Sequence, residues 1–345
     1  MPNARIFYSC LAVGLAPYTT PTAYMTLRGI QSAGVNTKFN LEQAFELGNI
    51  QLYEQIENVP EVEVTLEKDL DGYTPIYCLA TSGAPSATLV GRSNQRANVA
   101  LVIYPDTGSL ASGTPYQQCI MSGCYVSQES FSFNVQGFFK ESTTMVGNNK
   151  IWLTGSYTFN GFTSAGGVTS LAPAAPEGIN RRQHFNMPVC RFPRNIPGIS
   201  SSGTNDALTA EQFGASIQNV KVSVNLGREE LLELGRRVPY FRYVNFPVEV
   251  STSIEIIDKT GDLISATETG VYANGANVVP YAMRFKTSEG LGLDLGTQNM
   301  LNGVTMSGAN AGGRGGNSML TFNYQNFDDF TVTHTADPTG FTPGF

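Results

Sequence analysis

The sequence predicts a mainly β fold made of two tandem modules, each with one short flanking α-helix. Runs in which apolar and polar residues alternate strictly, such as Val220-Lys-Val222-Ser-Val224-Asn-Leu226, are typical of strands with one face on a core. An internal repeat, in which Ile30-Gln31 recurs as Ile217-Gln218, indicates that the chain carries the same unit twice. Charged residues make up 14% of the chain and hydrophobic residues 41%, which leaves enough apolar material for a core in each unit.

The composition excludes several classes of protein. With 20 Phe, 15 Tyr and a net charge of −7 in 345 residues, the chain has too many core formers and too little charge to be disordered. Its acidic balance argues against a nucleic-acid clamp, because phosphate binding needs clustered Lys and Arg. No apolar run reaches the roughly 18 residues of a membrane helix, so we expect no membrane span. The apolar run at residues 6–16 is interpreted as a strand rather than a signal peptide.

The repeat extends over most of the chain as blocks in a constant order. Met1-Pro recurs at Met187, Asp69-x-x-Gly72 at Asp258, Met121-Ser-Gly at Met306, and Phe133-Asn-x-Gln at Phe322. In the longest block, Val35, Glu42, Glu46, Leu47, Gly48, Tyr53, Asn58 and Pro60 match Val222, Glu229, Glu233, Leu234, Gly235, Tyr240, Asn245 and Pro247. The matches predict a first module over residues 1–160, a Gly, Ala and Pro-rich linker over 161–186 and a second module over 187–345.

Each module is expected to hold one legible helix. Asn40 is a candidate N-cap and Gly48 a C-terminal stop, and Gly227 to Gly235 repeat the pattern. Two turns are not stable alone in water, so each helix would have to lie on its own sheet. The pairs Glu42/Glu46 and Glu229/Glu233 could be read as acid-base carboxylates, but this spacing is typical of a solvated helix face. Between the helix and the later strands, both copies predict a hairpin or long loop, at Asp71-Gly72 between strands at 62–68 and 74–80 and at Gly261-Asp262.

Residues for catalysis or for metal and cofactor binding do not cluster in this sequence. His184 and His334 have no obvious nucleophile or acid nearby, and the cysteines at 10, 78, 119, 124 and 190 lack paired spacing, so we expect no enzyme, metal or cofactor. The Gly-rich run at 308–317 is longer than its counterpart and lacks a following Lys-Ser/Thr, which favours an elongated hairpin loop over a phosphate-binding loop. The basic group Arg181-Arg182 with His184 is either an anion or partner contact or a solvated linker end.

The order of an early strand, a short helix ending in Leu-Gly, a hairpin with a prominent loop and the late segment 124–142 resembles bacteriophage tail tube proteins. That resemblance implies a β-sandwich or barrel module with one flanking helix, and a ring in which six modules close a lumen. This tandem chain would then form a trimeric, pseudo-hexameric ring of a homo-oligomeric tube in the virion, assembled in the host cytoplasm. DNA would pass through the lumen without specific binding, and tape measure, sheath, terminator or baseplate proteins would be possible partners.

Two loops shared by the copies and the Gly-rich loop are the candidate contacts between rings or subunits. Their residues are Asp69, Asp71, Gly72, Asp258, Gly261, Asp262, Gly312 and Arg314; a mobile turn with no contact role is the other interpretation. Two alternative functions stay open. One is another virion ring protein, such as a tail terminator or baseplate ring. The other is a tandem β-sandwich carbohydrate-binding or adhesin module, which would also fit the many aromatic residues and the low charge.

Overall fold

The computed structural model describes residues 6, 8–19, 24–81, 86–105, 115–154, 178–199, 216–268, 279–308 and 316–334. It confirms the mainly β fold: antiparallel strands make up most of the described chain, with two short helices and a few 3-10 turns. Residues 161–177 of the predicted linker lie outside these residues, and so do Gly312 and Arg314. Among the described residues, no helix has the length and apolar character needed to cross a membrane.

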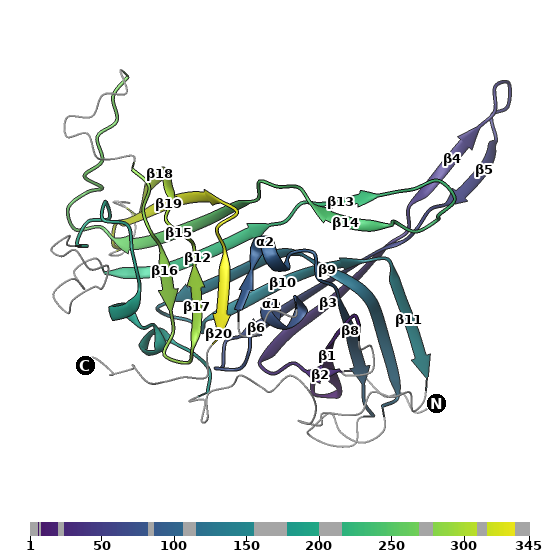
Figure 1. Cartoon of the computed structure of the whole chain (residues 1–345), viewed down its shortest axis with the longest axis horizontal. Helices are drawn as coiled ribbons and strands as arrows, with labels where there is room; N and C mark the ends of the chain where they lie inside the picture. Colours follow the sequence, from purple (N-terminus) through teal and green to yellow (C-terminus); the bar gives the residue numbers. More distant parts are fainter. Residues whose placement is uncertain are drawn as a thin grey trace.

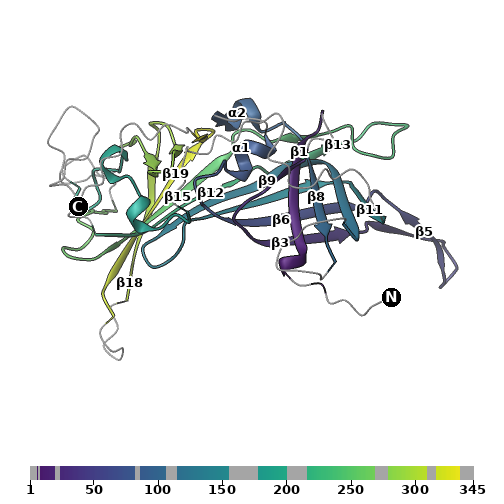
Figure 2. The same ribbon diagram turned by 90° about the horizontal axis from the view of Figure 1, so that it is seen from below.

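The main feature is a sheet in which eight strands follow one another in the order β18-β19-β15-β12-β9-β10-β6-β3 (Figures 1 and 2). All its neighbouring strands are antiparallel. The strands are β3 (Ile30–Lys38), β6 (Glu61–Asp69), β9 (Gln117–Asn134), β10 (Lys140–Gly147), β12 (Ile217–Asn225), β15 (Glu249–Ile257), β18 (Met300–Ser307) and β19 (Met319–Phe327). We call this the main sheet.

Strand β9 is long enough to belong to two parts of the structure. Its second half lies in the main sheet, and its first half pairs with β8 (Ala97–Ile103) and β11 (Asn149–Thr154). Strand β1 (Leu11–Pro17) follows β8 and pairs in turn with β2 (Met25–Thr26). The strand expected at residues 6–16 therefore exists as β1, preceded by the 3-10 turn η1 (Tyr8–Cys10).

One face of the main sheet is covered by a second sheet and two short helices, which Figure 2 shows on one side of it. The second sheet has the order β16-β17-β20-β7, with β16 (Arg284–Lys286), β17 (Leu291–Asp294), β20 (Thr331–His334) and β7 (Ser86–Thr88). Strand β7 comes from the first half of the chain and pairs with β20 near the end of the second. The core beneath is continuous across the halves, since Phe185 packs against Phe133, Phe139 and Phe285.

A buried carboxylate fixes helix α1 (Ile76–Ala80) on the sheet. Glu141, on β10, accepts hydrogen bonds of 2.9 Å from the backbone N–H groups of both Ile76 and Tyr77, which have no partner within so short a helix. The strand predicted at 74–80 is therefore wrong. Alternation alone did not reveal that a carboxylate distant in sequence satisfies the first turn of a helix. Helix α2 (Leu89–Arg92) follows β7.

The helices predicted at Asn40–Gly48 and Gly227–Gly235 are also wrong, because both segments form β-hairpins. Strand β4 (Leu41–Phe45) pairs with β5 (Leu52–Glu57), and β13 (Arg228–Leu231) pairs with β14 (Phe241–Val244). Gly48 and Gly235, expected to end helices, have φ of +89° and +87° near the hairpin ends, where the left-handed backbone lets the chain reverse. A two-turn helix here would have had no sheet to lie on, whereas a hairpin satisfies its own backbone groups.

Substitution of Glu129, on β9, tests the buried carboxylates. Its side chain is buried and accepts a hydrogen bond from Thr143 Oγ1, at 2.7 Å. Burial, and then the neighbouring Glu141 carboxylate, raise the pKa of Glu129 well above 4.5. The folded chain therefore keeps a proton that the unfolded chain loses above about pH 4.5, so this group lowers stability as pH rises towards the folded-state pKa. Glutamine carries no titratable proton, so we expect the unfolding free energy of Glu129→Gln, measured with urea, to rise relative to that of the native chain as the pH increases from 5 to 8. If the difference between the two unfolding free energies stayed constant over that range, the prediction would be contradicted.

Candidate assembly surface

The main sheet consists of two groups of four strands with the same internal order. The first-half group is β9-β10-β6-β3 and the second-half group is β18-β19-β15-β12. Along the chain, each group begins with its last strand, β3 or β12, which leads into a hairpin, β4–β5 or β13–β14. The chain then returns as β6 or β15, and adds the hairpin β9–β10 or β18–β19 later. The order in space and the order in sequence therefore both repeat.

The irregularities of the strands repeat as well. β3 shifts register against β6 at Gln31, and β12 shifts against β15 at Gln218. β9 shifts against β10 at Ser127, and β18 shifts against β19 at Asn302. A bulge interrupts ladder hydrogen bonds and fixes the register of the residues beyond it. The matched bulges therefore define which residue of one group corresponds to which residue of the other.

This correspondence agrees with the sequence repeat in one region and departs from it in another. Gln31 and Gln218 are matched by both. Met306, by contrast, holds the place of Phe131 rather than Met121, and Phe322 holds the place of Thr143 rather than Phe133. Alternating strands of similar composition produce short local matches, and such matches do not identify which strand of the sheet is equivalent.

The two groups are joined by β12 and β9, which pair from Asn219 opposite Asn134 to Asn225 opposite Gln128. We call this pairing the internal junction. On its core side Val222 faces Phe131, and both are buried. Just beyond the strand, the Leu226 N–H donates to Ser127 O at 2.8 Å, and the Leu226 side chain is 1% exposed. Backbone pairing and side-chain burial thus make the junction part of the core.

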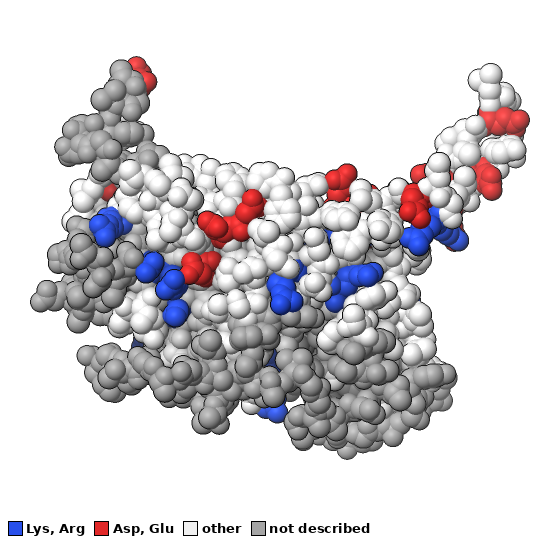
Figure 3. Space-filling model, viewed as in Figure 1, with Lys and Arg blue, Asp and Glu red and all other residues white. Residues whose placement is uncertain are grey.

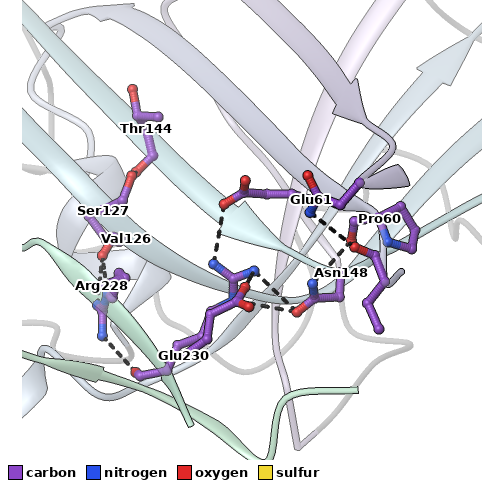
Figure 4. Close-up of polar contacts among 11 residues, drawn as sticks. Pro60, Glu61, Val126, Ser127, Thr144, Asn148, Arg228 and Glu230 are labelled. Carbon is purple, nitrogen blue, oxygen red and sulfur yellow. Dashed lines mark hydrogen bonds and ion pairs between the residues drawn. The ribbon is translucent and has the colours of Figure 1, made fainter. Parts of the chain in front are cut away.

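Two arginines seat the β13–β14 hairpin against the first-half group (Figure 4). Arg228 Nε donates to Val126 O at 2.8 Å, and its Nη2 also donates to Ser93 O. Arg242 is 3% exposed, and its Nη1 lies 3.4 Å from Glu61 Oε1. Its Nη2 forms an ion pair with Glu230 of the same hairpin. Burial lowers the pKa of Arg228 to about 10, which still leaves it charged at neutral pH. Charged hydrogen bonds to β9 and β6 therefore hold this hairpin on its own chain.

Further contacts complete this seat. Asn148 Oδ1 accepts from Arg242 at 3.3 Å, and its Nδ2 donates to Pro60 O at 3.0 Å. The Tyr125 ring meets Phe241 edge to face at 5.4 Å. Arg237 Nη2 donates to Glu57 O at 3.0 Å, which links the β13–β14 hairpin to the base of the β4–β5 hairpin. Figure 1 shows the β4–β5 hairpin continuing outward from this point.

The ends of the main sheet are unpaired within the described part of the chain. There, β3 pairs only with β6, and β18 only with β19. Large apolar side chains are exposed beside these edges: Phe39 is 71% exposed beyond β3, and Met306 is 58% exposed on β18. The β4–β5 hairpin adds Leu41, Phe45, Leu47, Ile50, Leu52, Tyr53 and Ile56, all exposed. Open strand edges flanked by apolar groups are typical of surfaces that pair with another chain.

The uncovered face of the main sheet is polar. Cross-strand neighbours run from Gln325 through Ser251, Ser223, Ser130, Ser142 and Glu67 to Ser32. A parallel row holds Asn323, Ser253, Lys221, Ser132 and Lys140. Short hydroxyl side chains dominate, and charges of both signs are interspersed. This face offers no basic groove for a phosphate backbone.

Charged groups on the visible surface form no continuous patch of one sign (Figure 3). Acidic groups lie along the projecting hairpin at the upper right and basic groups lie at its base. Within the ranges described above, no group of three His, Cys, Asp or Glu residues is placed to hold a metal ion. Each of the five cysteines is buried and free.

The predicted contact loops lie at one end of the main sheet. Asp69 is buried, and Asp71 lies 3.3 Å from the buried Lys68 Nζ. Gly72 adopts φ of +77°, and its carbonyl lies 3.0 Å from His334 Nε2. In the second half, Asp258 accepts from Gly261 N, and Asp262 accepts from Ile264 N. A contact role for these loops stays a prediction. Arg182 and His184 form part of the 3-10 turn η2 (Arg182–His184), where His184 is buried.

No protein-family model matches this sequence, and no curated protein matches it either. Among solved structures, the chain is similar to a chain in the structure of the anti-feeding prophage baseplate, with 15% sequence identity and a TM-score of 0.33; the match covers 44% of this chain and 97% of the other. It is also similar to a chain in the structure of the anti-feeding prophage cap, with 11% sequence identity and a TM-score of 0.33; this match covers 45% of this chain and 94% of the other. A third is the sheath/tube terminator of an extracellular contractile injection system, with 12% identity and a TM-score of 0.34 over 45% and 100%. These values are too low for the likeness to establish a family.

Sequence reasoning missed the features that define this surface. Arg228 and Arg242 carry no motif, and the hairpin that they position was predicted as a helix. The sequence feature that could have predicted both hairpins is the matched Glu-Leu-Gly at 46–48 and 233–235. A Gly followed by a second alternating run is typical of a hairpin turn as well as of a helix end.

Removal of Arg242 should loosen the β13–β14 hairpin. Arg242→Ala deletes charged hydrogen bonds to Asn148 and Glu61, and we expect a loss of about 2 kcal/mol in unfolding free energy, since hydrogen bonds to charged groups contribute roughly that much. Hydrogen exchange of the β13 and β14 amides should accelerate. Arg237→Ala removes a single exposed contact to Glu57 and serves as the control. Equal exchange in the two variants would show that Arg242 does not anchor the hairpin.

Proposed function

We propose that this chain is a structural, non-enzymatic component of a virion tail tube. Three copies would close their main sheets into one barrel around a lumen, and such rings would stack. The observation that carries the proposal is the internal junction. It already joins two equivalent four-strand groups side by side, and among the described residues the edges that correspond to the two joined strands, β3 and β18, have no second partner.

Edge chemistry supports ring closure. An open eight-stranded sheet leaves two rows of unpaired backbone groups, and full closure removes both. Because β3 and β18 differ from each other, the contact between copies is heterologous, and heterologous contacts close into rings when the rotation between copies allows it. Three copies with eight main-sheet strands each would give a barrel of about 24 strands, wide enough for an open lumen.

The polar face supports an assignment to the lumen. If the covered face lies outside, the rows of Ser, Thr, Asn and Gln line the channel. The exposed acids Glu63, Glu67 and Glu249 would oppose the exposed Lys140 and Lys221 on this face. DNA could then pass without a continuous basic track that would hold its phosphates.

The projecting hairpins support stacking. Leu47 and Ile50 near the end of β4–β5, and Leu234 near the end of β13–β14, are fully exposed. A second ring placed over these tips would bury them, and a contact that does not close produces a filament.

Electron microscopy of the purified protein tests the proposal. We expect hollow rings of three chains that extend into tubes, and Met306→Lys to abolish them, because the added charge would be buried at the paired edge. Since Met306 is 58% exposed in the single chain, that variant should still fold. Val90→Lys, at an exposed position on α2, is the matched control and should still assemble. Monomers at all concentrations would refute the proposal, and discrete single rings would favour a terminator or baseplate ring.

A further inference from the structure

We propose that β3 of one copy binds β18 of the next in the register of the internal junction, and that Phe39 there fills the place that Leu226 fills within one chain. This inference rests on the proposed function and adds the partner surface and its register. The contact would extend to the β4–β5 hairpin, which would lie across the second-half group of the neighbouring copy.

The register follows from the matched bulges. Within one chain, Val222 lies opposite Phe131 and Ser223 opposite Ser130. Val35 and Asn36 hold the places of Val222 and Ser223 in the first-half group. Met306 and Thr305 hold the places of Phe131 and Ser130 in the second-half group. Between copies, Val35 should therefore face Met306 and Asn36 should face Thr305.

This register puts like side chains on the same face. Val35 packs against the core, and Met306 lies opposite the buried Leu320 on the core side of the sheet. Asn36 and Thr305 are exposed on the polar face. A slip of one residue would place Met306 against Asn36 and turn apolar groups towards the polar side. The pattern of both edges thus selects the register that the bulges give.

Phe39 provides an independent observation. It corresponds to Leu226, which follows β12 and is 1% exposed, yet Phe39 is 71% exposed. The Leu226 N–H donates to the bulge carbonyl of Ser127, and the matching bulge in the second half is Asn302. Phe39 of one copy would therefore donate to Asn302 O of the next and lose its exposed apolar surface there.

The hairpin seat has apolar counterparts on both partners. Leu41 holds the place of Arg228, and Met300 holds the place of Tyr125. Phe327 follows Asn326, the counterpart of Gly147, and so holds the place of Asn148. Phe327 is 52% exposed and Leu41 is 50% exposed. The charged seat within one chain would become an apolar contact between two chains.

Paired cysteines test the register. In Asn36→Cys/Thr305→Cys, the two thiols of one chain lie about 34 Å apart across seven strand spacings, so a disulfide can form only between copies. We expect oxidation to give covalent dimers and a trimer that closes. Ser130→Cys/Ser223→Cys reproduces the same pairing inside one chain and calibrates the yield. Ser32→Cys/Thr305→Cys, displaced by four residues or about 13 Å along the strand, should stay monomeric.

The outcomes separate this inference from the proposed function. If electron microscopy showed rings but intermolecular disulfides formed only in Ser32→Cys/Thr305→Cys, or in neither intermolecular pair, the proposed register would be overturned. The proposal that the chain forms rings would still stand. No rings and no intermolecular cross-links, while the internal pair oxidises fully, would overturn both.

A second pair of variants isolates Phe39. Leu226→Ala should lower the unfolding midpoint of the unassembled chain, because it opens a core cavity. Phe39→Ala should leave the unfolding midpoint of the unassembled chain unchanged and raise the concentration needed for assembly at least tenfold. If Phe39→Ala assembled at the same protein concentration as the native chain, Phe39 would not contribute to the contact.

Discussion

The pairing of β12 with β9 is the interaction on which the rest of the structure depends. It joins the two halves through backbone hydrogen bonds on seven matched positions, and it places Val222 against Phe131 in one continuous core. Strand β7 adds a second crossing, since it belongs to the first half and completes the sheet of β20. Neither half therefore buries its apolar surface alone. Within the described residues, β3 and β18 lack the second neighbouring strand that β12 and β9 find in each other, which is why the proposed contact between copies is placed at these two edges.

The contact inside the chain and the proposed contact between copies differ in chemistry for a physical reason. Inside the chain, the β13–β14 hairpin is covalently connected to the strands on which it lies. Its contacts therefore do not have to offset the loss of freedom of a separate molecule, and Arg228 and Arg242 chiefly fix its orientation. Between copies in the proposed ring, association would have to offset the lost freedom of whole molecules, and apolar burial would supply that free energy. Arg228 and Asn148 in the internal seat, and their counterparts Leu41 and Phe327 in the proposed contact, would follow this division.

The sequence predicted the β class and located several strands because alternation with a period of two is a local property. It also matched Gln31 with Gln218, and both lie at a register shift between neighbouring strands. It failed at residues 41–45 and 228–231, where short segments carry enough helix formers to mimic a helix and the deciding partner strand lies further along the chain. It failed at α1 because Glu141, which caps the helix, lies about sixty residues away. The assembly surface could not be read at all, since edges and exposed apolar groups exist only once the strand order is known.

The two halves differ in their interior as well as at their edges. The first half buries Glu129, Glu141 and Lys68 beneath α1, whereas the corresponding places in the second half hold Val304, Leu320 and Ile256. Among the described residues, the first half alone uses charged groups to position a helix. In the proposed ring, the covalent link between the halves would explain why such differences are tolerated. A ring of six separate modules would lose translational and rotational freedom at six contacts, while a ring of three such chains would do so at three, with the other three fixed by covalent connection. The internal contact would then be free to be polar and asymmetric, and self-association would depend on β3, β18 and the apolar hairpin.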